Sequence, residues 1–198
     1  MMNPLMRKLA PTATHQIRTD HTHVLSIFHQ YETDTAPQTK KALVNSACLS
    51  LEIHSQLEEE IFYPAMRQAM AEGGTVDKAV GEHQEMHRLI AQLRGMEPTD
   101  MDYDETFMTL MRDVLHHAAE EETILLPKAE RLLGSSRLTE LGGEMMKRRL
   151  ELAKPHAGEI AMNGVRTMHT STLLMTTGAV AAGAYLVKKV FDRGHHHV

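Results

Sequence analysis

Apolar residues recur at steps of three and four along the chain and form four separate stripes between Ile17 and Ile124. The first two stripes are Ile17, His21, Val24 and Phe28, and then Leu43, Ala47, Ser50, His54, Glu58, Ile61 and Ala65. The other two are Val76, Val80, His83, His87, Ile90 and Leu93, and then Phe107, Leu110, Val114, His117, Glu121 and Ile124. Each stripe predicts an amphipathic helix with one side in a core. The polar members lie near the middle of each stripe, so we expect them to be buried.

Helix-breaking residues separate the four stripes. Pro37 lies within residues 35–38, Gly73-Gly74 predicts the end of the second helix, and residues 95–100 contain Pro98. Gly134 with its two following serines predicts the end of the fourth helix. Because no segment shows the alternation of a strand, the sequence predicts an all-α fold. We expect an up-down-up-down four-helix bundle over residues 14–133.

Composition narrows the classes of function. The chain has 198 residues and a net charge of -5 with acids and bases interspersed, so it offers no basic face and a nucleic-acid partner is not expected. A single cysteine excludes an internal disulfide, and residues 1–14 lack the apolar core of a secretory signal. We therefore expect a cytoplasmic globular domain. Fourteen histidines stand out in a chain with so few aromatic residues.

One pattern occurs twice in the sequence. His54 precedes Glu58 by four residues, and His117 precedes Glu121 by four residues, with an offset of 63 between the copies. Pro64 and Pro127 follow at the same offset, and an acid-histidine pair precedes each copy at residues 20–21 and 82–83. Residues four apart lie on one helix face. The repeat therefore predicts two similar two-helix units, each of which directs an imidazole and a carboxylate at one point.

Seven polar side chains thus fall on inward stripes at one level of the bundle, and these candidate metal ligands are His21, His54, Glu58, His83, His87, His117 and Glu121. Each buried polar group without a partner would cost roughly 1–3 kcal/mol, whereas a bound cation would use all of them as ligands. Seven ligands exceed the roughly four of structural zinc, which usually includes thiolates. Nitrogen and oxygen ligands favour two iron ions with a bridging oxide or hydroxide, with manganese or a mixed pair as alternatives. Ligand counting leaves one position for a small diatomic ligand or peroxide.

These motifs resemble the hemerythrin family, specifically the hemerythrin-like HHE cation-binding domain, over about Thr14 to Leu133. The resemblance implies a non-haem di-iron centre in which His83, His87 and His117 serve one iron and His21 and His54 serve the other. It also implies that Glu58 and Glu121 bridge the two ions. One departure is that oxygen-carrying hemerythrins place an aspartate five residues after the histidine, where this chain has Glu121 four residues after. The resemblance therefore favours the broader HHE group, whose members are linked to sensing, peroxide handling and iron–sulfur cluster repair.

The remaining chain extends beyond the predicted bundle. We expect a short helix and a linker at Lys154-Pro155 within residues 134–166, and then an apolar C-terminal helix over residues 167–190. Residues 167–187 contain no formal charge and would form a helix about 31 Å long, close to the thickness of a bilayer's hydrocarbon core. Two interpretations stay open, a membrane tether and a helix packed against protein.

Three functions compete at this stage. The first is a module that binds or senses dioxygen or nitric oxide at an open iron position. The second is a di-iron enzyme of oxidative or nitrosative stress, acting in peroxide decomposition or iron–sulfur cluster repair. The third is a protein whose metal mainly supports its fold. The sequence leaves open whether the protein is an enzyme, and it leaves open the oligomeric state.

Overall fold

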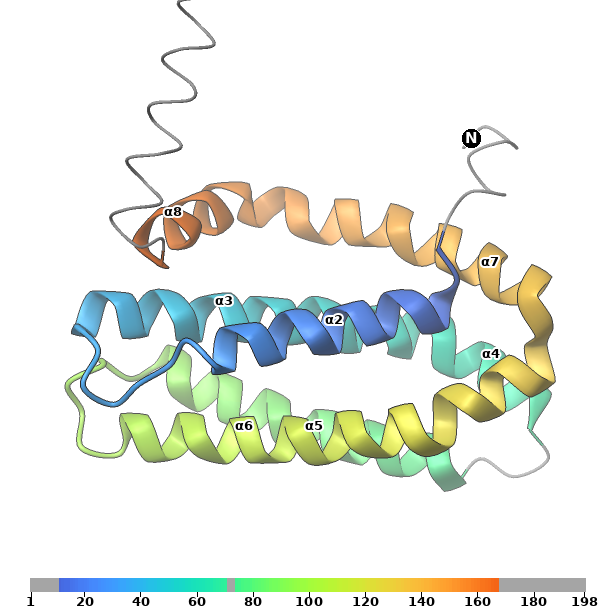
Figure 1. The fold of residues 1–198 in the computed structure, drawn as a ribbon, viewed down its shortest axis with the longest axis horizontal. Helices are drawn as coiled ribbons and strands as arrows, with labels where there is room; N and C mark the ends of the chain where they lie inside the picture. Colours follow the sequence, from blue (N-terminus) through green and yellow to red (C-terminus); the bar gives the residue numbers. More distant parts are fainter. Residues whose placement is uncertain (1–10, 71–73, 168–198) are drawn as a thin grey trace, which may run out of the picture.

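The structure, a computed structural model, describes residues 11–70 and 74–167, and these residues are almost entirely helical (Figure 1). The four main helices are α2 (Ala13–Phe28), α3 (Pro37–Leu57), α5 (Gly74–Arg94) and α6 (Tyr103–Glu120). The remaining elements are η1 (Glu58–Phe62), α4 (Tyr63–Ala69), η2 (Glu121–Leu125), α7 (Leu126–Ala153), η3 (Lys154–His156) and α8 (Ala157–Thr167). The described residues contain no strand, which confirms the all-helical prediction.

Local chemistry explains most of the helix ends. The Thr12 side chain caps the first helix by accepting a hydrogen bond from the backbone of His15. Pro37 begins α3 as its first residue, where a proline needs no helical partner for its nitrogen. The predicted glycine cap of the second helix is wrong, because that helix ends at Ala69 and Gly74 is instead the first residue of α5.

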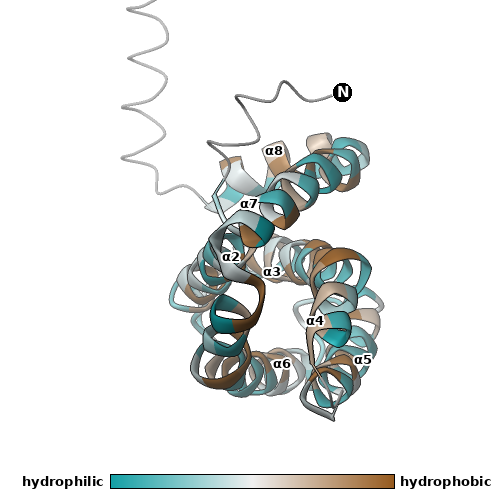
Figure 2. Cartoon of the chain, turned by 90° about the vertical axis from the view of Figure 1, so that its right-hand side faces the viewer, coloured by the Kyte–Doolittle hydropathy of each residue, from teal (hydrophilic) through white to brown (hydrophobic). Residues whose placement is uncertain are grey.

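The four main helices enclose one core. Helix α2 contacts α3 and α6, and α5 contacts the same two helices, so the four form a closed ring (Figure 2). Two apolar clusters fill it. One gathers around Phe28, Tyr103 and Phe107, where α2 ends and α6 begins, and the other gathers around Ile17, Phe62 and Leu126 towards the opposite end. The layer between the two clusters is polar.

Helices α7 and α8 lie on the outside of this ring. Gly134 has φ 67° and ψ 167°, a conformation that favours glycine, and it bends α7 so that the later part packs on α2. Gly142 lets the chain before α2 approach closely, since an added Cβ would lie 2.0 Å from the Pro11 carbonyl oxygen. A short helix and a linker at Lys154-Pro155 were expected within residues 134–166, and the chain is indeed helical after the break at Gly134. Helix continues to Ala153, η3 replaces the linker, and α8 packs on α3.

The proposed membrane segment gains no support. Within the described parts of the chain, no helix is both long enough and apolar enough to cross a bilayer. The predicted apolar helix over residues 167–190 lies outside the described residues from position 168 onward.

Candidate metal centre

Six of the seven predicted ligands meet in the polar layer, and all six are buried: His21, His54, Glu58, His83, His117 and Glu121. Each main helix contributes one histidine, and η1 and η2 contribute the two glutamates. Apolar side chains lie above and below each of these residues. On α3, for example, Leu51 belongs to one apolar cluster and Leu57 to the other, with His54 between them. The packing of the two clusters therefore fixes the level at which the six side chains converge.

Glu58 lies between a histidine of the first half of the chain and a histidine of the second half. Its Oε2 is 3.2 Å from His54 Nε2 and 3.4 Å from His83 Nε2. His83 Nε2 in turn is 3.2 Å from His117 Nε2. The ligand atoms of these four residues all lie within 4.8 Å of one another, close enough to hold one metal ion.

Glu121 occupies the equivalent position on the other side of the cluster. Its Oε2 is 3.4 Å from His21 Nε2 and 3.6 Å from His117 Nε2. A second group of candidate ligands consists of His21, His54 and Glu121. Each glutamate therefore contacts one histidine from each half, which is the arrangement that two carboxylates need to bridge a pair of ions.

Both glutamates begin a π-helical turn that is followed by a proline. The Tyr63 backbone N–H donates to the Glu58 carbonyl, and the Leu126 N–H donates to that of Glu121, five residues back in each case. Pro64 and Pro127 cannot donate to the carbonyls four residues before them, and a proline ring clashes with that carbonyl in a regular helix. A wider turn directly before the proline relieves this conflict, and such turns are frequent at functional sites.

The extra residue in each π-turn shifts the buried face by one position. Ile61 and Ile124 were predicted to face the core, but Ile61 is only partly buried and Ile124 is 53% exposed. Phe62 and Leu125 are buried in their place. The prediction assumed 3.6 residues per turn throughout, and it is wrong where the turn widens.

The site contains an excess of buried polar atoms without partners. Six buried side-chain nitrogen or oxygen atoms in the described residues lack a hydrogen bond, and five of them belong to this cluster. They are His21 Nε2, both ring nitrogens of His54, Glu58 Oε1 and Glu121 Oε2. Each would cost roughly 1–3 kcal/mol. A cation would convert these atoms into ligands, so the residues present fit a metal centre.

The protonation of the metal-free site follows from burial and mutual charge. Burial raises the pKa of Glu58 well above its ordinary range, and the charge of Glu121 adds to the effect. Burial also acts to raise the pKa of Glu121, but His21 at 3.4 Å and the other nearby histidines outweigh it and lower that pKa to about 2. Burial acts to lower the pKa of His21, yet the neighbouring Glu121 carboxylate raises it to about 9. Burial lowers the pKa of His54 to about 4. Protons therefore occupy Glu58 and His21 at neutral pH, and a metal ion would displace them.

Three of the histidines form hydrogen bonds to carboxylates that lie outside the cluster. In each case the Nδ1 atom donates to a carboxylate oxygen, which leaves Nε2 free to face the cluster. The pairs are His21 with Glu122 at 2.9 Å, His83 with Glu59 at 2.9 Å and His117 with Glu82 at 2.8 Å. His54 differs, because its Nδ1 is 3.5 Å from Asp20, whose carboxylate accepts a 2.6 Å bond from Arg149 of α7. The acid-histidine pairs at residues 20–21 and 82–83 thus supply both a ligand and a support.

Tyr63 is a site residue that the sequence analysis missed. Its hydroxyl is 2.9 Å from Glu121 Oε1, 3.2 Å from Glu58 Oε2 and 3.4 Å from His83 Nε2, and the side chain is fully buried. The repeat offers one signal that could have found it. At the offset of 63, Pro64 matches Pro127, whereas Tyr63 matches Leu126. A tyrosine therefore replaces an apolar residue at one of two otherwise equivalent positions.

His87 does not join the cluster. It is exposed, its Nε2 lies 3.1 Å from Ser55 Oγ, and it belongs to neither buried group of candidate ligands. Met86 is buried instead. The prediction that His87 faces inward is wrong, because the buried face of α5 continues from His83 through Met86 to Leu89 and Ile90 and leaves His87 outside it.

A small cavity borders the cluster, and Tyr63 is not among the residues that line it. Its volume is about 10 Å³, on the order of one water molecule. Its polar lining consists of site histidines together with Asp20, Ser55 and His87. Its apolar lining consists of Val24, Leu51, Met86, Ile90 and Val114. Any molecule that approaches the metal ligands from this side must be very small.

Comparisons with known proteins agree with the fold and with the kind of site. The family model described as hemerythrin HHE cation binding domain matches residues 12–129. A crystal structure of a hemerythrin HHE cation binding domain-containing protein from Mycobacterium kansasii, the Rv2633c homolog, is similar with a TM-score of 0.64 and 19% identity. That likeness covers 80% of this chain and 99% of the other. A curated protein of Nostoc sp., a DNA nickase, is 26% identical over 149 residues, or 75% of this chain. The chain spans only 42% of that relative's length.

Proposed function

Because the chain belongs to the hemerythrin HHE cation-binding domain family, we propose that its buried cluster is a non-haem di-iron centre that binds or senses dioxygen or nitric oxide. The single observation that carries the proposal is that each buried glutamate lies between histidines of the two halves. One ion would take His21 and His54, and the other would take His83 and His117. Glu58 and Glu121 would bridge them.

The donor set supports iron. The cluster supplies imidazole nitrogens and carboxylate oxygens with no thiolate, which suits iron, with manganese or a mixed pair as alternatives. The Tyr63 oxygen lies next to both glutamates and to His83, so we infer that it takes the ligand place expected of His87. We infer that the four main helices run up-down-up-down. Redox change and binding of a small ligand are the chemistry that two irons supply in such a site.

The surrounding residues favour a diatomic ligand. The cavity beside the cluster holds about one water-sized molecule, and apolar side chains supply much of its lining. Such a lining favours an uncharged ligand such as dioxygen or nitric oxide over a charged substrate, because a buried charge without a partner is costly. Three outer carboxylates keep the Nδ1 protons away from the ligand side and hold each imidazole in one orientation.

Metal analysis and optical spectroscopy test this proposal. Protein loaded with ferrous iron should contain two irons per chain, and Glu58→Ala should contain fewer. The reduced protein should gain an absorption band on exposure to oxygen and lose it under vacuum. An irreversible colour change would contradict reversible binding.

Peroxide decomposition is the alternative function, and one observation favours it. Ser55 and His87 line the same cavity, so a hydroxyl and an imidazole could exchange protons with a ligand that turns over there. Peroxide consumption by the iron-loaded protein should then fall in Glu58→Ala, and equal rates in the two proteins would refute this alternative.

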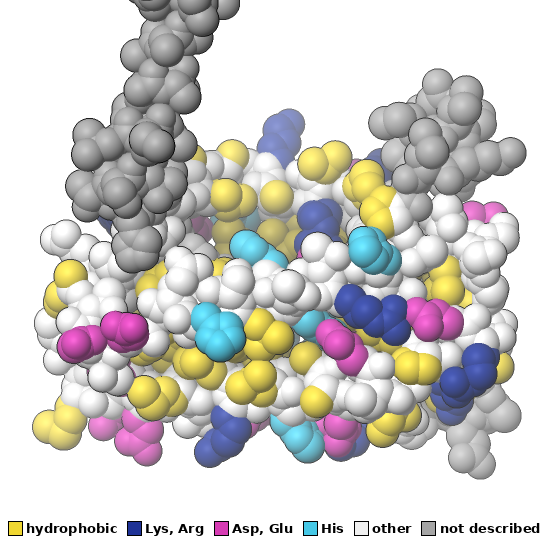
Figure 3. Space-filling model, viewed as in Figure 1, with side chains coloured by type: hydrophobic (Ala, Val, Ile, Leu, Met, Phe, Trp, Pro, Cys, Tyr) yellow, Lys and Arg dark blue, Asp and Glu magenta, His cyan; other side chains and the backbone are white. Residues whose placement is uncertain are grey.

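The nickase activity of the Nostoc relative is not proposed for this chain. A net charge of -5 provides little attraction for a phosphate backbone, and charges of both signs are interspersed over the face shown in Figure 3.

A further inference from the structure

His87 stands out because it connects the inner cavity to the surface. It lies on α5 one turn beyond His83, it is exposed, and it contacts buried Ser55 of α3 through Nε2 at 3.1 Å. Both residues line the small cavity beside the cluster. A histidine with this position is neither an ordinary surface residue nor one of the converging ligands.

An outer cleft lies on the other side of His87. Its volume is about 600 Å³ and it is open to solvent. Residues of α3, η1, α7 and η3 line it together with His87, and they include Ile53, Gln56, Glu60, Leu152 and His156. Among the residues that the structure describes, His87 alone lines both this cleft and the inner cavity. The imidazole therefore forms part of the partition between solvent and the cluster.

We propose that the Ser55–His87 pair is the gate through which a small ligand reaches the metal centre from the outer cleft. The inference rests on the proposed function, since it needs a ligand that binds at the cluster. Opening requires only a side-chain rotation of an exposed residue and the loss of one hydrogen bond, whereas the neighbouring walls are packed helices. Rotation of an exposed side chain is fast, whereas separating two tightly packed helices is slow and costly.

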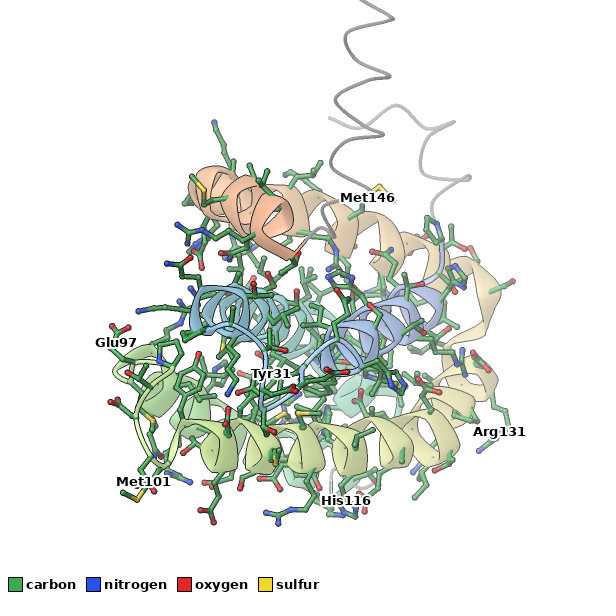
Figure 4. The ribbon with its side chains drawn as sticks, turned by 60° about the vertical axis from the view of Figure 1, so that its left-hand side comes forward. Tyr31, Glu97, Met101, His116, Arg131 and Met146 are labelled. Atoms are coloured by element: carbon green, nitrogen blue, oxygen red, sulfur yellow. The ribbon has the colours of Figure 1, made fainter. Side chains whose placement is uncertain are left out.

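Nitric oxide binding to the reduced, iron-loaded full chain measures the gate directly. In stopped-flow experiments, His87→Ala and Ser55→Ala should each bind nitric oxide about fivefold faster than the wild type, because one ordinary hydrogen bond no longer holds the closed state. Both variants should keep two irons per chain and an unchanged optical spectrum. His116→Ala is the matched control, since His116 is also exposed but points away from the bundle on α6 (Figure 4). It should bind nitric oxide at the wild-type rate.

The iron content separates the competing explanations. If His87→Ala loses iron or changes its spectrum, His87 is a ligand that turns inward on metal binding, and the gate proposal is wrong. Unchanged binding rates with full iron content would place the entrance elsewhere and would also overturn it. A wild-type chain that takes up no iron would refute the proposed function itself, and the gate with it. That outcome is visible before any variant is made.

Discussion

Replacing Tyr63 with phenylalanine removes one hydroxyl from the centre of the site and leaves the ring in place. The hydroxyl is fully enclosed, and its nearest acceptor is Glu121, 2.9 Å away. Glu121 stays ionised in the metal-free protein because the nearby histidines lower its pKa to about 2. The bond that Tyr63 donates is therefore a bond to a charged acceptor. The substitution creates no large cavity, so its effect reports the interactions of the hydroxyl, of which the bond to Glu121 is the shortest.

The expected loss follows from the strength of such bonds. A hydrogen bond to a charged group contributes roughly 1.5–3 kcal/mol, a large share of the roughly 5–15 kcal/mol that stabilises a typical protein. We expect Tyr63→Phe to lower the free energy of unfolding of the metal-free protein by about 2 kcal/mol. For a chain of this size that corresponds to a fall in melting temperature of roughly 4–8 °C.

Urea unfolding in the presence of a chelator, followed by circular dichroism, measures this difference. Tyr103→Phe is the matched control, because its ring is equally buried and its hydroxyl forms no side-chain hydrogen bond within the described residues. A loss below about 0.5 kcal/mol in Tyr63→Phe, or an equal loss in the control, would refute the reasoning. The same variant, once loaded with iron, should lose any visible absorption that comes from a phenolate ligand.

Three further predictions concern the cluster. Adding ferrous iron should raise the melting temperature of the wild type but not of His54→Ala, since only a folded site binds the metal; scanning calorimetry with and without chelator decides this. The pKa of His21 is about 9 in the folded protein and about 6.5 unfolded. Its contribution to the stability of the metal-free protein is therefore complete below pH 6.5 and is lost as the pH rises to 9. His21→Gln should remove this part of the pH dependence, and parallel wild-type and variant curves would contradict it. Glu59→Gln and Glu122→Gln should weaken iron binding roughly 10- to 100-fold in chelator competition, whereas Glu85→Gln, at an exposed pair with Arg88, should match the wild type.

Much of this site could be predicted from the sequence because its main signals are local. The spacing from His54 to Glu58 and from His117 to Glu121 is a property of single helices, and the repeat of 63 residues indicates that the two copies have the same role. Burial of a polar side chain within an apolar stripe then predicts convergence. Six of the seven proposed ligands converge for these reasons.

The missed features depend on helix positions and long-range contacts that the spacing of apolar residues does not reveal. In α5 the buried residues are Val76, Ala79, His83, Met86, Leu89, Ile90 and Leu93, a line that contains neither Val80 nor His87. The sequence stripe used Val80 and His87 instead, and both lie one position off that line. A histidine at the edge of the stripe and a methionine at its centre differ by only one step around the helix, so neighbouring helices decide between them. Tyr63 was missed because its role comes from Glu121, 58 residues away.

The mismatch between Tyr63 and Leu126 also breaks the equality of the two halves. A perfect duplication would give two ions with identical surroundings, which would load and exchange alike. Here a phenol lies 3.4 Å from His83 in one half, and a leucine stands at the corresponding position of the other half. We expect the two positions to fill in sequence, with the first ion held tightly and the second exchanging with free metal. Samples prepared with substoichiometric iron should therefore contain mainly singly occupied chains. When iron is scarce, the protein would keep the tightly bound ion and lose the other.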